Sequence, residues 1–177
     1  MLYKEYDPPA GRSTIAHSRP LPMIEAKKPL KIFVSVLEQK LYVLSGGTVL
    51  ATYPCSTSAL GLGTAEGSYK TPTGRFRICQ KIGGGAPLGE VFKGRMPTGK
   101  IAVEGEDGDL ITTRILWLDG LDPDNANTQR RYIYIHGTNH EAEIGKADSH
   151  GCVRMRNVHV AELYELVVVG TQVLIAS

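Results

Sequence analysis

The sequence predicts a mainly β domain with one long helix near the C-terminus. Three observations support this fold class. Glycine accounts for 20 of the 177 residues, about 11% against a usual ~7%, which is typical of a chain with many turns. From Leu30 onward, apolar and polar residues alternate as they do in half-buried strands. Helical spacing of apolar residues is convincing in one segment only, Val158–Val169.

The first expected element is a β-hairpin whose two halves are joined at Glu38-Gln39. Its alternating apolar positions are Ile32, Val34 and Val36, followed by Leu41 and Val43. Gly46-Gly47 supplies the next turn, because both residues can adopt positive φ. Thr48–Cys55 is then expected to form a further strand.

The middle of the chain alternates between loops and strands. The Ser-, Thr- and Gly-rich segment Ser56–Gly74 leads into a strand at Arg75–Gln80. The triplet Gly83-Gly84-Gly85 opens a stretch that we expect to be irregular and that also contains Gly89, Gly94 and Gly99. Strands are expected at Leu110–Leu118 and at Tyr132–Ile135, and the second of these delivers His136 to its end.

The C-terminal part contains the predicted helix and a closing strand. Asn157 is a suitable N-cap for Val158–Val169, and Gly170 a suitable stop. One face of this helix carries Val160, Leu163, Tyr164 and Val167. Thr171–Ala176 is expected to close the domain as a strand.

Residues 1–29 are interpreted as an extended N-terminal arm, and residues 30–177 as one folded domain. The arm shows no periodic apolar pattern and contains five prolines, Pro8, Pro9, Pro20, Pro22 and Pro29. Residues 1–30 hold five basic and three acidic residues, whereas residues 31–177 hold fifteen of each. The basic excess therefore belongs to the arm.

Composition and pattern argue against several classes of protein. Lysine and arginine do not cluster, so nucleic-acid binding is not expected. No run approaches the ~20 apolar residues of a membrane span. The N-terminus lacks the apolar stretch of roughly 7–15 residues that a secretory signal needs.

Three cysteines do not make a disulfide framework. Cys55 and Cys79 lie in apolar, strand-like segments and are expected to be small core residues, with a bridge between them left open. Cys152 lies in a different setting, a glycine-containing turn.

Two neighbouring motifs carry the chemistry of the sequence: His136-Gly137-Thr138-Asn139-His140 and Ser149-His150-Gly151-Cys152. A cysteine reacts as its thiolate, and a histidine partner can take the thiol proton. His136 and His150 are both candidates for that role. Gly151 would let the backbone bend sharply and direct N–H groups at a developing oxyanion. A turn directly before a helix would also make Cys152 accessible to a substrate.

The stretch from Tyr132 to Met155 resembles the catalytic motif of the L,D-transpeptidases, the YkuD-like cysteine enzymes that act on peptidoglycan. The resemblance covers nearly all of Leu30–Ser177 and also includes Thr71-Pro72-Thr73-Gly74-Arg75-Phe76 and Gly170-Thr171-Gln172-Val173. It implies a β-sandwich or barrel-like fold with one long C-terminal helix.

The resemblance also implies roles for individual residues. Cys152 would be the nucleophile and His136 its general base, with the imidazole held by the carbonyl of Gly137. His150 and Ser149 would shape the turn, and N–H groups around Gly151 and Cys152 would form the oxyanion hole. Arg154, Tyr134 and Thr138 would contact the substrate.

Arg154 is a departure from the family pattern, since many members carry asparagine at that position. Its guanidinium could bind a substrate carboxylate through a two-pronged contact. It could equally form a structural salt bridge, with Glu162 or Asp148 as the partner.

The implied substrate is the stem tetrapeptide of peptidoglycan. Cys152 would form a thioester and release the terminal D-alanine, and an amine would then complete a 3→3 cross-link. A lipoprotein lysine is an alternative acceptor, and water as acceptor would make the protein an L,D-carboxypeptidase. No metal or organic cofactor is expected, acylation by carbapenems is implied, and the implied location is the periplasm or the cell wall.

Two other classes of function compete with this interpretation. His136, His140, His150 and Cys152 could together form a structural zinc site, because zinc accepts both ligand types. Otherwise His140 is expected to be an exposed loop residue. A module that binds wall peptides without turnover is the second alternative.

Overall fold

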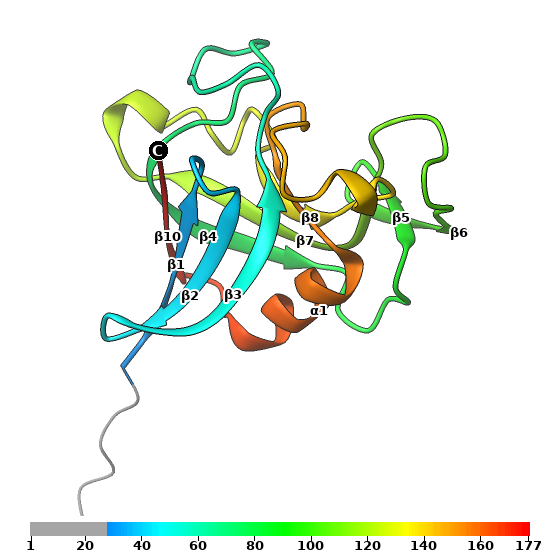
Figure 1. The fold of residues 1–177 in the computed structure, drawn as a ribbon, viewed down its shortest axis with the longest axis horizontal. Coiled ribbons are helices and arrows are strands. Elements are labelled where there is room, and N and C mark those ends of the chain that lie inside the picture. The colour runs from blue at the N-terminus through cyan, green and yellow to red at the C-terminus, as the bar shows by residue number, and fades with distance from the viewer. Residues whose placement is uncertain (1–27) are drawn as a thin grey trace, which may run out of the picture.

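The computed structural model describes residues 28–177, so the arm predicted for residues 1–29 lies almost wholly outside the described part. The chain there forms ten strands and one α-helix, joined by two short 3₁₀ turns (Figure 1). The strands are β1 (Leu30–Ser35), β2 (Lys40–Ser45), β3 (Thr48–Ser56), β4 (Gly74–Ile82), β5 (Glu90–Lys93), β6 (Met96–Ile101), β7 (Ile111–Gly120), β8 (Tyr134–Gly137), β9 (Val153–Met155) and β10 (Gln172–Ala176). The helix α1 spans Asn157–Leu166, and the 3₁₀ turns are η1 (Pro123–Asn125) and η2 (Glu141–Glu143).

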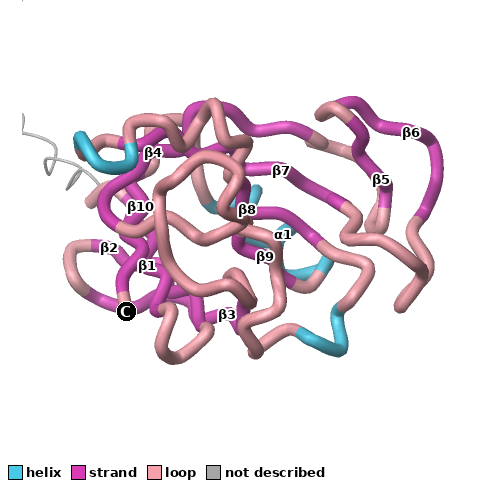
Figure 2. The backbone as a smooth tube through the Cα atoms, turned by 90° about the horizontal axis from the view of Figure 1, so that it is seen from above, coloured by secondary structure: helices cyan, strands magenta, loops and turns pink. Residues whose placement is uncertain are grey.

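The sheet closes on itself as a barrel. Hydrogen-bonded neighbours follow in the order β4-β10-β1-β2-β3-β9-β8-β7, and β7 pairs again with β4. Two of the pairings are parallel, β1 with β10 and β8 with β9. The β5–β6 hairpin is added to the outside of this ring through β7 and extends away from β1 and β2 (Figure 2). These findings confirm the predicted mainly β, barrel-like fold class.

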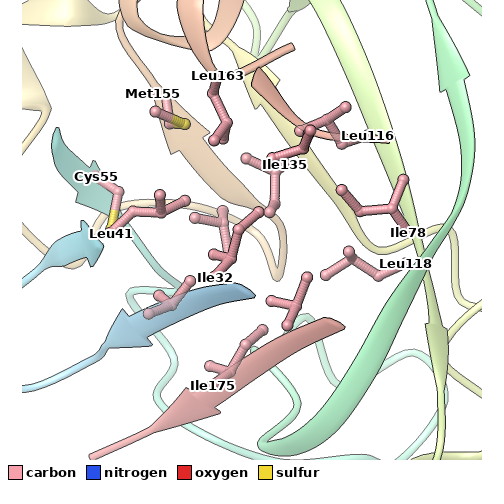
Figure 3. Packing of buried hydrophobic residues seen from close by; sticks show 14 of the residues in the cluster. Ile32, Leu41, Cys55, Ile78, Leu116, Leu118, Ile135, Met155, Leu163 and Ile175 are labelled. Carbon is pink, nitrogen blue, oxygen red and sulfur yellow. The ribbon is translucent and has the colours of Figure 1, made fainter. Parts of the chain in front are cut away.

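Alternate residues of the strands fill the barrel, as period-two patterning requires. The core includes Ile32, Leu41, Cys55, Ile78, Leu116, Leu118, Ile135, Met155 and Ile175, joined by Leu163 from α1 (Figure 3). The helix spans from β3 to β4, because His159 contacts Tyr53 and Lys81 donates hydrogen bonds to the last carbonyls of the helical segment. α1 therefore lies across one end of the barrel.

The helix is shorter than predicted, and its N-cap is a different residue. Arg156 occupies the N-cap position, and the helix ends at Leu166 because the β-branched Val167 is extended and a turn at Val169-Gly170 follows. Asn157 connects elements rather than capping the helix: its Oδ1 accepts hydrogen bonds from Thr112 and Thr113 of β7, and its Nδ2 donates to the Thr138 carbonyl at 2.9 Å.

The predicted irregular region after Gly83 is wrong in part, since it contains β5 and β6. Gly89 and Gly94 lie in turns and Gly99 lies within β6, all three at positive φ, and both strands are short. A second difference lies at Cys152, which precedes the short strand β9 and not the helix directly.

Candidate active site

The expected site residues gather on the outer face of β8 and β9. These strands pair in parallel, with Ile135 opposite Val153 and His136 opposite Arg154. Ile133, Ile135 and Val153 point into the barrel core, so the intervening side chains point outward. Tyr134 and Cys152 accordingly pack together in a second cluster outside the barrel, with Phe92 and Ile115.

Cys152 is partly buried and its sulfur contacts main-chain groups. The Tyr134 N–H donates to Sγ at 3.3 Å, and the thiol donates to the Tyr132 carbonyl at 3.5 Å. Among residues 28–177, these are the hydrogen-bond partners of the sulfur, so the thiol is not bonded to His136 in this arrangement.

His136 is buried and held in one tautomer. Its Nδ1 lies 2.6 Å from the Gly137 carbonyl oxygen, a contact that requires a proton on Nδ1. Nε2 of the neutral ring is then free to accept a proton. A side chain at Gly137 would lie 2.8 Å from the Thr112 carbonyl and closer still to Asn157, so only glycine fits there.

The turn before Cys152 is fixed by Ser149, Gly151 and Thr71. Ser149 Oγ donates to the Cys152 carbonyl at 2.6 Å and accepts from the Gly151 N–H at 3.2 Å. Thr71 Oγ1 donates to the Gly151 carbonyl at 3.0 Å. Gly151 has φ of 117°, a conformation that favours glycine. Of the expected oxyanion donors, the Gly151 N–H thus already has a partner.

Arg154 is 3% exposed and forms ion pairs with two carboxylates. Its guanidinium donates to Asp148 Oδ2 at 2.9 Å, to the Asp148 carbonyl at 2.8 Å and to Asp109 Oδ2 at 2.9 Å. Of the two interpretations of Arg154, this geometry matches the salt bridge to Asp148. Asp109 also accepts from His150 Nδ1 at 2.9 Å, and the His150 side chain is 63% exposed.

The other two residues predicted to contact the substrate, Tyr134 and Thr138, lie in different environments. Tyr134 lies beside Cys152 with its hydroxyl 3.4 Å from Arg95. Thr138 is fully buried, and its Oγ1 accepts from the His140 N–H at 3.1 Å. It lies one residue beyond the strand that carries His136.

Burial shifts the pKa values of both Cys152 and His136. It raises the pKa of Cys152 to about 12, and the nearby Tyr134 N–H offsets only part of that effect. Burial also lowers the pKa of His136, although the charge of Asp109 acts in the opposite direction. Thiol and imidazole are therefore both neutral at rest. Desolvation raises the pKa of Cys152 more than the nearby positive charges of Arg154 and Arg131 lower it.

The structure does not bring the four residues of the alternative zinc site together. His140 Nε2 lies 3.0 Å from the Gly108 carbonyl, while His150 is bound to Asp109. Within residues 28–177, no group of three or more His, Cys, Asp or Glu side chains is arranged to hold a metal ion.

All three cysteines are free. Cys55 is buried in the core as expected, and burial raises its pKa to about 12. Cys79 is only half-buried and donates to the Trp117 carbonyl at 3.4 Å.

The comparison with known protein families matches this geometry to one of them. The L,D-transpeptidase catalytic domain (YkuD) matches residues 29–175. The chain belongs to the L,D-transpeptidase family. The resemblance inferred from the His136 and Cys152 motifs is thereby confirmed.

Relatives and a solved structure of L,D-transpeptidases agree with this assignment. The chain is 30% identical to Bacillus subtilis YkuD over 94% of its own length and 76% of that protein. It is 48% identical to Bacillus subtilis YqjB over 30% of its length and 31% of that protein. The solved L,D-transpeptidase LdtMt1, in complex with imipenem, has a similar fold, with a TM-score of 0.54 and 21% identity. The chain matches over 84% of its own length and spans 59% of that structure.

Several residues near the L,D-transpeptidase motif were not found by sequence reasoning. Arg95 and Trp117 come from distant parts of the chain, and neither belongs to a recognisable motif. Asp109 lies in an acidic run, Glu104, Glu106, Asp107 and Asp109, whose composition suggests only a solvated loop. Its position beside Arg154 depends on tertiary folding alone.

No helix within the described range 28–177 has the length and apolar character that a membrane crossing requires.

Proposed function

We propose that this protein is a cysteine transpeptidase acting on peptidoglycan stem tetrapeptides. The observation that carries the proposal is the position of Cys152, just before β9, on the same outward face as His136 of the paired strand β8, with the imidazole held by the Gly137 carbonyl. Membership of the L,D-transpeptidase family supports the class of reaction.

The first half-reaction would form a thioester on Cys152. The thiol turns from the Tyr132 carbonyl toward His136, whose Nε2 takes its proton as the sulfur attacks the carbonyl carbon of the third stem residue. The carbon–nitrogen bond to the terminal D-alanine then breaks. The proton on Nε2 passes to the departing amine, and free D-alanine leaves.

The second half-reaction would transfer the acyl group to an amine. An amine of a second stem peptide loses a proton to His136 and attacks the thioester carbonyl, and the Cys152 sulfur leaves and recovers the proton. A 3→3 cross-link results, while a lipoprotein lysine would give an anchored protein and water an L,D-carboxypeptidase. The neutral resting pair supports this proton-transfer mechanism over a preformed thiolate–imidazolium pair.

A groove beside the site supports the binding of an extended peptide. It has a volume of about 440 Å³ and is lined by Ile82, Ala86, Phe92 and the Gly83-Gly84-Gly85 loop, among others. Ile82, Ala86 and Phe92 also pack in the cluster that contains Cys152. The groove therefore shares part of its lining with the cluster against which Cys152 packs. The proposed substrate would place the protein in the periplasm or at the cell wall.

The Cys152→Ala variant tests the assignment. We expect it to lose release of D-alanine from a tetrapeptide stem while its circular dichroism spectrum is unchanged, because the reaction needs the sulfur. His136→Ala should approach the same loss. Cys79→Ala and His140→Ala are matched controls, since both lie outside the proposed reaction, and should retain turnover. Unchanged turnover by Cys152→Ala would refute the proposal.

The products would distinguish the acceptors. Incubation with defined stem peptides and separation by mass should yield cross-linked dimers if an amine is the acceptor. Tripeptide alone would indicate hydrolysis. A carbapenem adduct on Cys152, seen as a mass increase absent from Cys152→Ala, would provide independent support for the acyl-enzyme; a relative of this fold is known in complex with imipenem.

A further inference from the structure

The turn of the β5–β6 hairpin carries an arginine in a conformation that glycine adopts more easily. Lys93 and Met96 are paired across the hairpin, so Gly94-Arg95 forms a two-residue loop. The two residues have φ of 57° and 69°, the positive values of a type I′ turn. Glycine is preferred at the second of these positions and arginine is uncommon there. A long cationic side chain thus occupies the second turn position, where the backbone conformation favours glycine.

The Arg95 guanidinium lies over aromatic rings. It is 4.5 Å from the centre of the Trp117 ring and 5.3 Å from that of Tyr132, and those two rings are stacked on each other at 5.9 Å. It also donates a long hydrogen bond, 3.4 Å, to the Tyr134 hydroxyl. Cation–π contacts orient the guanidinium without neutralising its charge.

Arg95 is the cation near Cys152 that remains available to an anion. Over residues 28–177 it forms no ion pair with a carboxylate, whereas Arg154 is bound by two. Arg131, also near the cysteine, donates instead to the carbonyls of Gly63 and Lys70 and to Ser68. Arg95 itself is only partly buried, so an incoming carboxylate can reach it.

The aromatic side chains of Trp117, Tyr132 and Tyr134 link Arg95 to Cys152. Tyr134 donates its N–H to the Cys152 sulfur, and its ring packs edge-on against Trp117 at 5.8 Å. Trp117 and Cys152 both pack against the buried cluster that contains Tyr134. One tyrosine therefore separates the reacting sulfur from the free guanidinium.

Resting on the proposed function, we propose that Arg95 binds the terminal carboxylate of the donor peptide. The carbonyl attacked by Cys152 lies one residue, roughly 3.3–3.6 Å of extended chain, from that carboxylate. A guanidinium matches a carboxylate through two parallel N–H···O bonds. The site would then select peptides that end one residue beyond the bond to be broken.

Trp117 gives a binding test that does not require turnover, because it is the only tryptophan in the chain. In Cys152→Ala, titration with a tetrapeptide bearing a free C-terminal carboxylate should change its fluorescence at lower concentration than titration with the C-terminal amide. Adding Arg95→Gln should weaken binding of the carboxylate peptide on the order of tenfold to a hundredfold and remove the preference. Equal binding of the two peptides by Cys152→Ala, or no binding of either, would overturn the proposal.

Steady-state kinetics of Arg95 variants that retain Cys152 test the role of Arg95 separately from the proposed transpeptidase reaction. Arg95→Gln should raise KM for the carboxylate peptide with a smaller change in kcat. Arg95→Lys should have a KM between those of Arg95→Gln and the wild type, because lysine keeps the positive charge but loses the two parallel N–H donors of the guanidinium. Lys93→Gln, which removes an exposed cation from the same hairpin, is the matched control and should leave KM unchanged.

The outcomes of the two proposals differ. Turnover with the same carboxylate preference in wild type and Arg95→Gln would refute the role of Arg95 alone. Absence of turnover in the wild type, with Arg95-dependent binding retained in Cys152→Ala, would refute the proposed reaction and leave the carboxylate site standing.

Discussion

The residues packed around Cys152 and His136 exclude water from both side chains, and this desolvation determines how the site responds to pH. The neutral form of His136 is the one that accepts a proton, and burial lowers its pKa below the ordinary value of 6.5. Activity should therefore fall only when the pH drops below 6.5. Protonation of His136 also favours the unfolded state, so the free energy of unfolding decreases over the same acidic range.

The acid limb of kcat/KM should have its midpoint below pH 6.5, as a pH series of D-alanine release would measure. Alkylation of Cys152 by iodoacetamide provides a second measurement, because only the thiolate reacts rapidly. With a thiol pKa of about 12, the rate should show no inflection near the ordinary value of 9.0. An inflection below pH 9 in the protein, with a free-thiol peptide as reference, would contradict the neutral resting pair.

The family could be predicted from sequence because Cys152 and His136 lie in short, specific motifs. The thiol pKa could not, since it depends on how tightly Tyr134 and its neighbours exclude water. Likewise the contact between Arg154 and Asp109 could not be predicted, because it required knowing that the loop carrying Asp109 folds back over β9.

At the scale of elements, Arg154 forms ion pairs that link two loops to the three-residue strand β9. β9 has three residues and offers few ladder hydrogen bonds of its own. The Asp109 carboxylate comes from the loop before β7, and Asp148 comes from the loop before Cys152. Their ion pairs with Arg154 therefore stabilise the position of β9 and of Cys152 directly before it.

Arg154→Gln should destabilise the protein by about 2–3 kcal/mol, measured by urea denaturation. This is less than the ~3–5 kcal/mol of a fully buried broken pair, because Asp109 and Asp148 keep contact with solvent. Arg77→Gln is the matched control: its pair with Asp119 is exposed, and its loss should cost less than about 1 kcal/mol. Equal effects of the two substitutions would contradict the supporting role of Arg154.

Most elements follow from the sequence, and the exceptions have physical causes. The alternation of apolar residues predicted β1, β2, β3 and β7 because each of these strands has one face in the core. β6 escaped prediction because all six of its residues are exposed, which leaves no apolar alternation to detect. β9 is too short to show a period, and the valines after Leu166 satisfied the apolar helical pattern while their branched side chains favour extended backbone.

At the scale of the whole molecule, ring closure links the two ends of the described chain. β10 pairs with β1 on one side and β4 on the other, so the last strand completes the barrel. Without it, two strand edges would be left unpaired.

Ile175→Ala should cost about 2–5 kcal/mol of folding free energy, because Ile175 is fully buried among core residues of several strands. Chemical denaturation with both fluorescence and circular dichroism would measure the loss as one cooperative transition. Leu174→Ala, an exposed neighbour on the same strand, is the control and should change stability by less than about 0.5 kcal/mol. A similar loss in both variants would argue against the closed core.

The direction of β1 has a consequence for how the domain could be presented to its surroundings. Leu30 begins β1 at the end of the barrel that carries the Gly46-Gly47 turn and α1, whereas Cys152 precedes β9 at the opposite end, beside the end of β3 (Figure 1). Any segment joined before Lys28 is therefore attached at the end of the barrel opposite Cys152. Immobilisation through the N-terminal segment would therefore leave the turn that carries Cys152 facing away from the point of attachment.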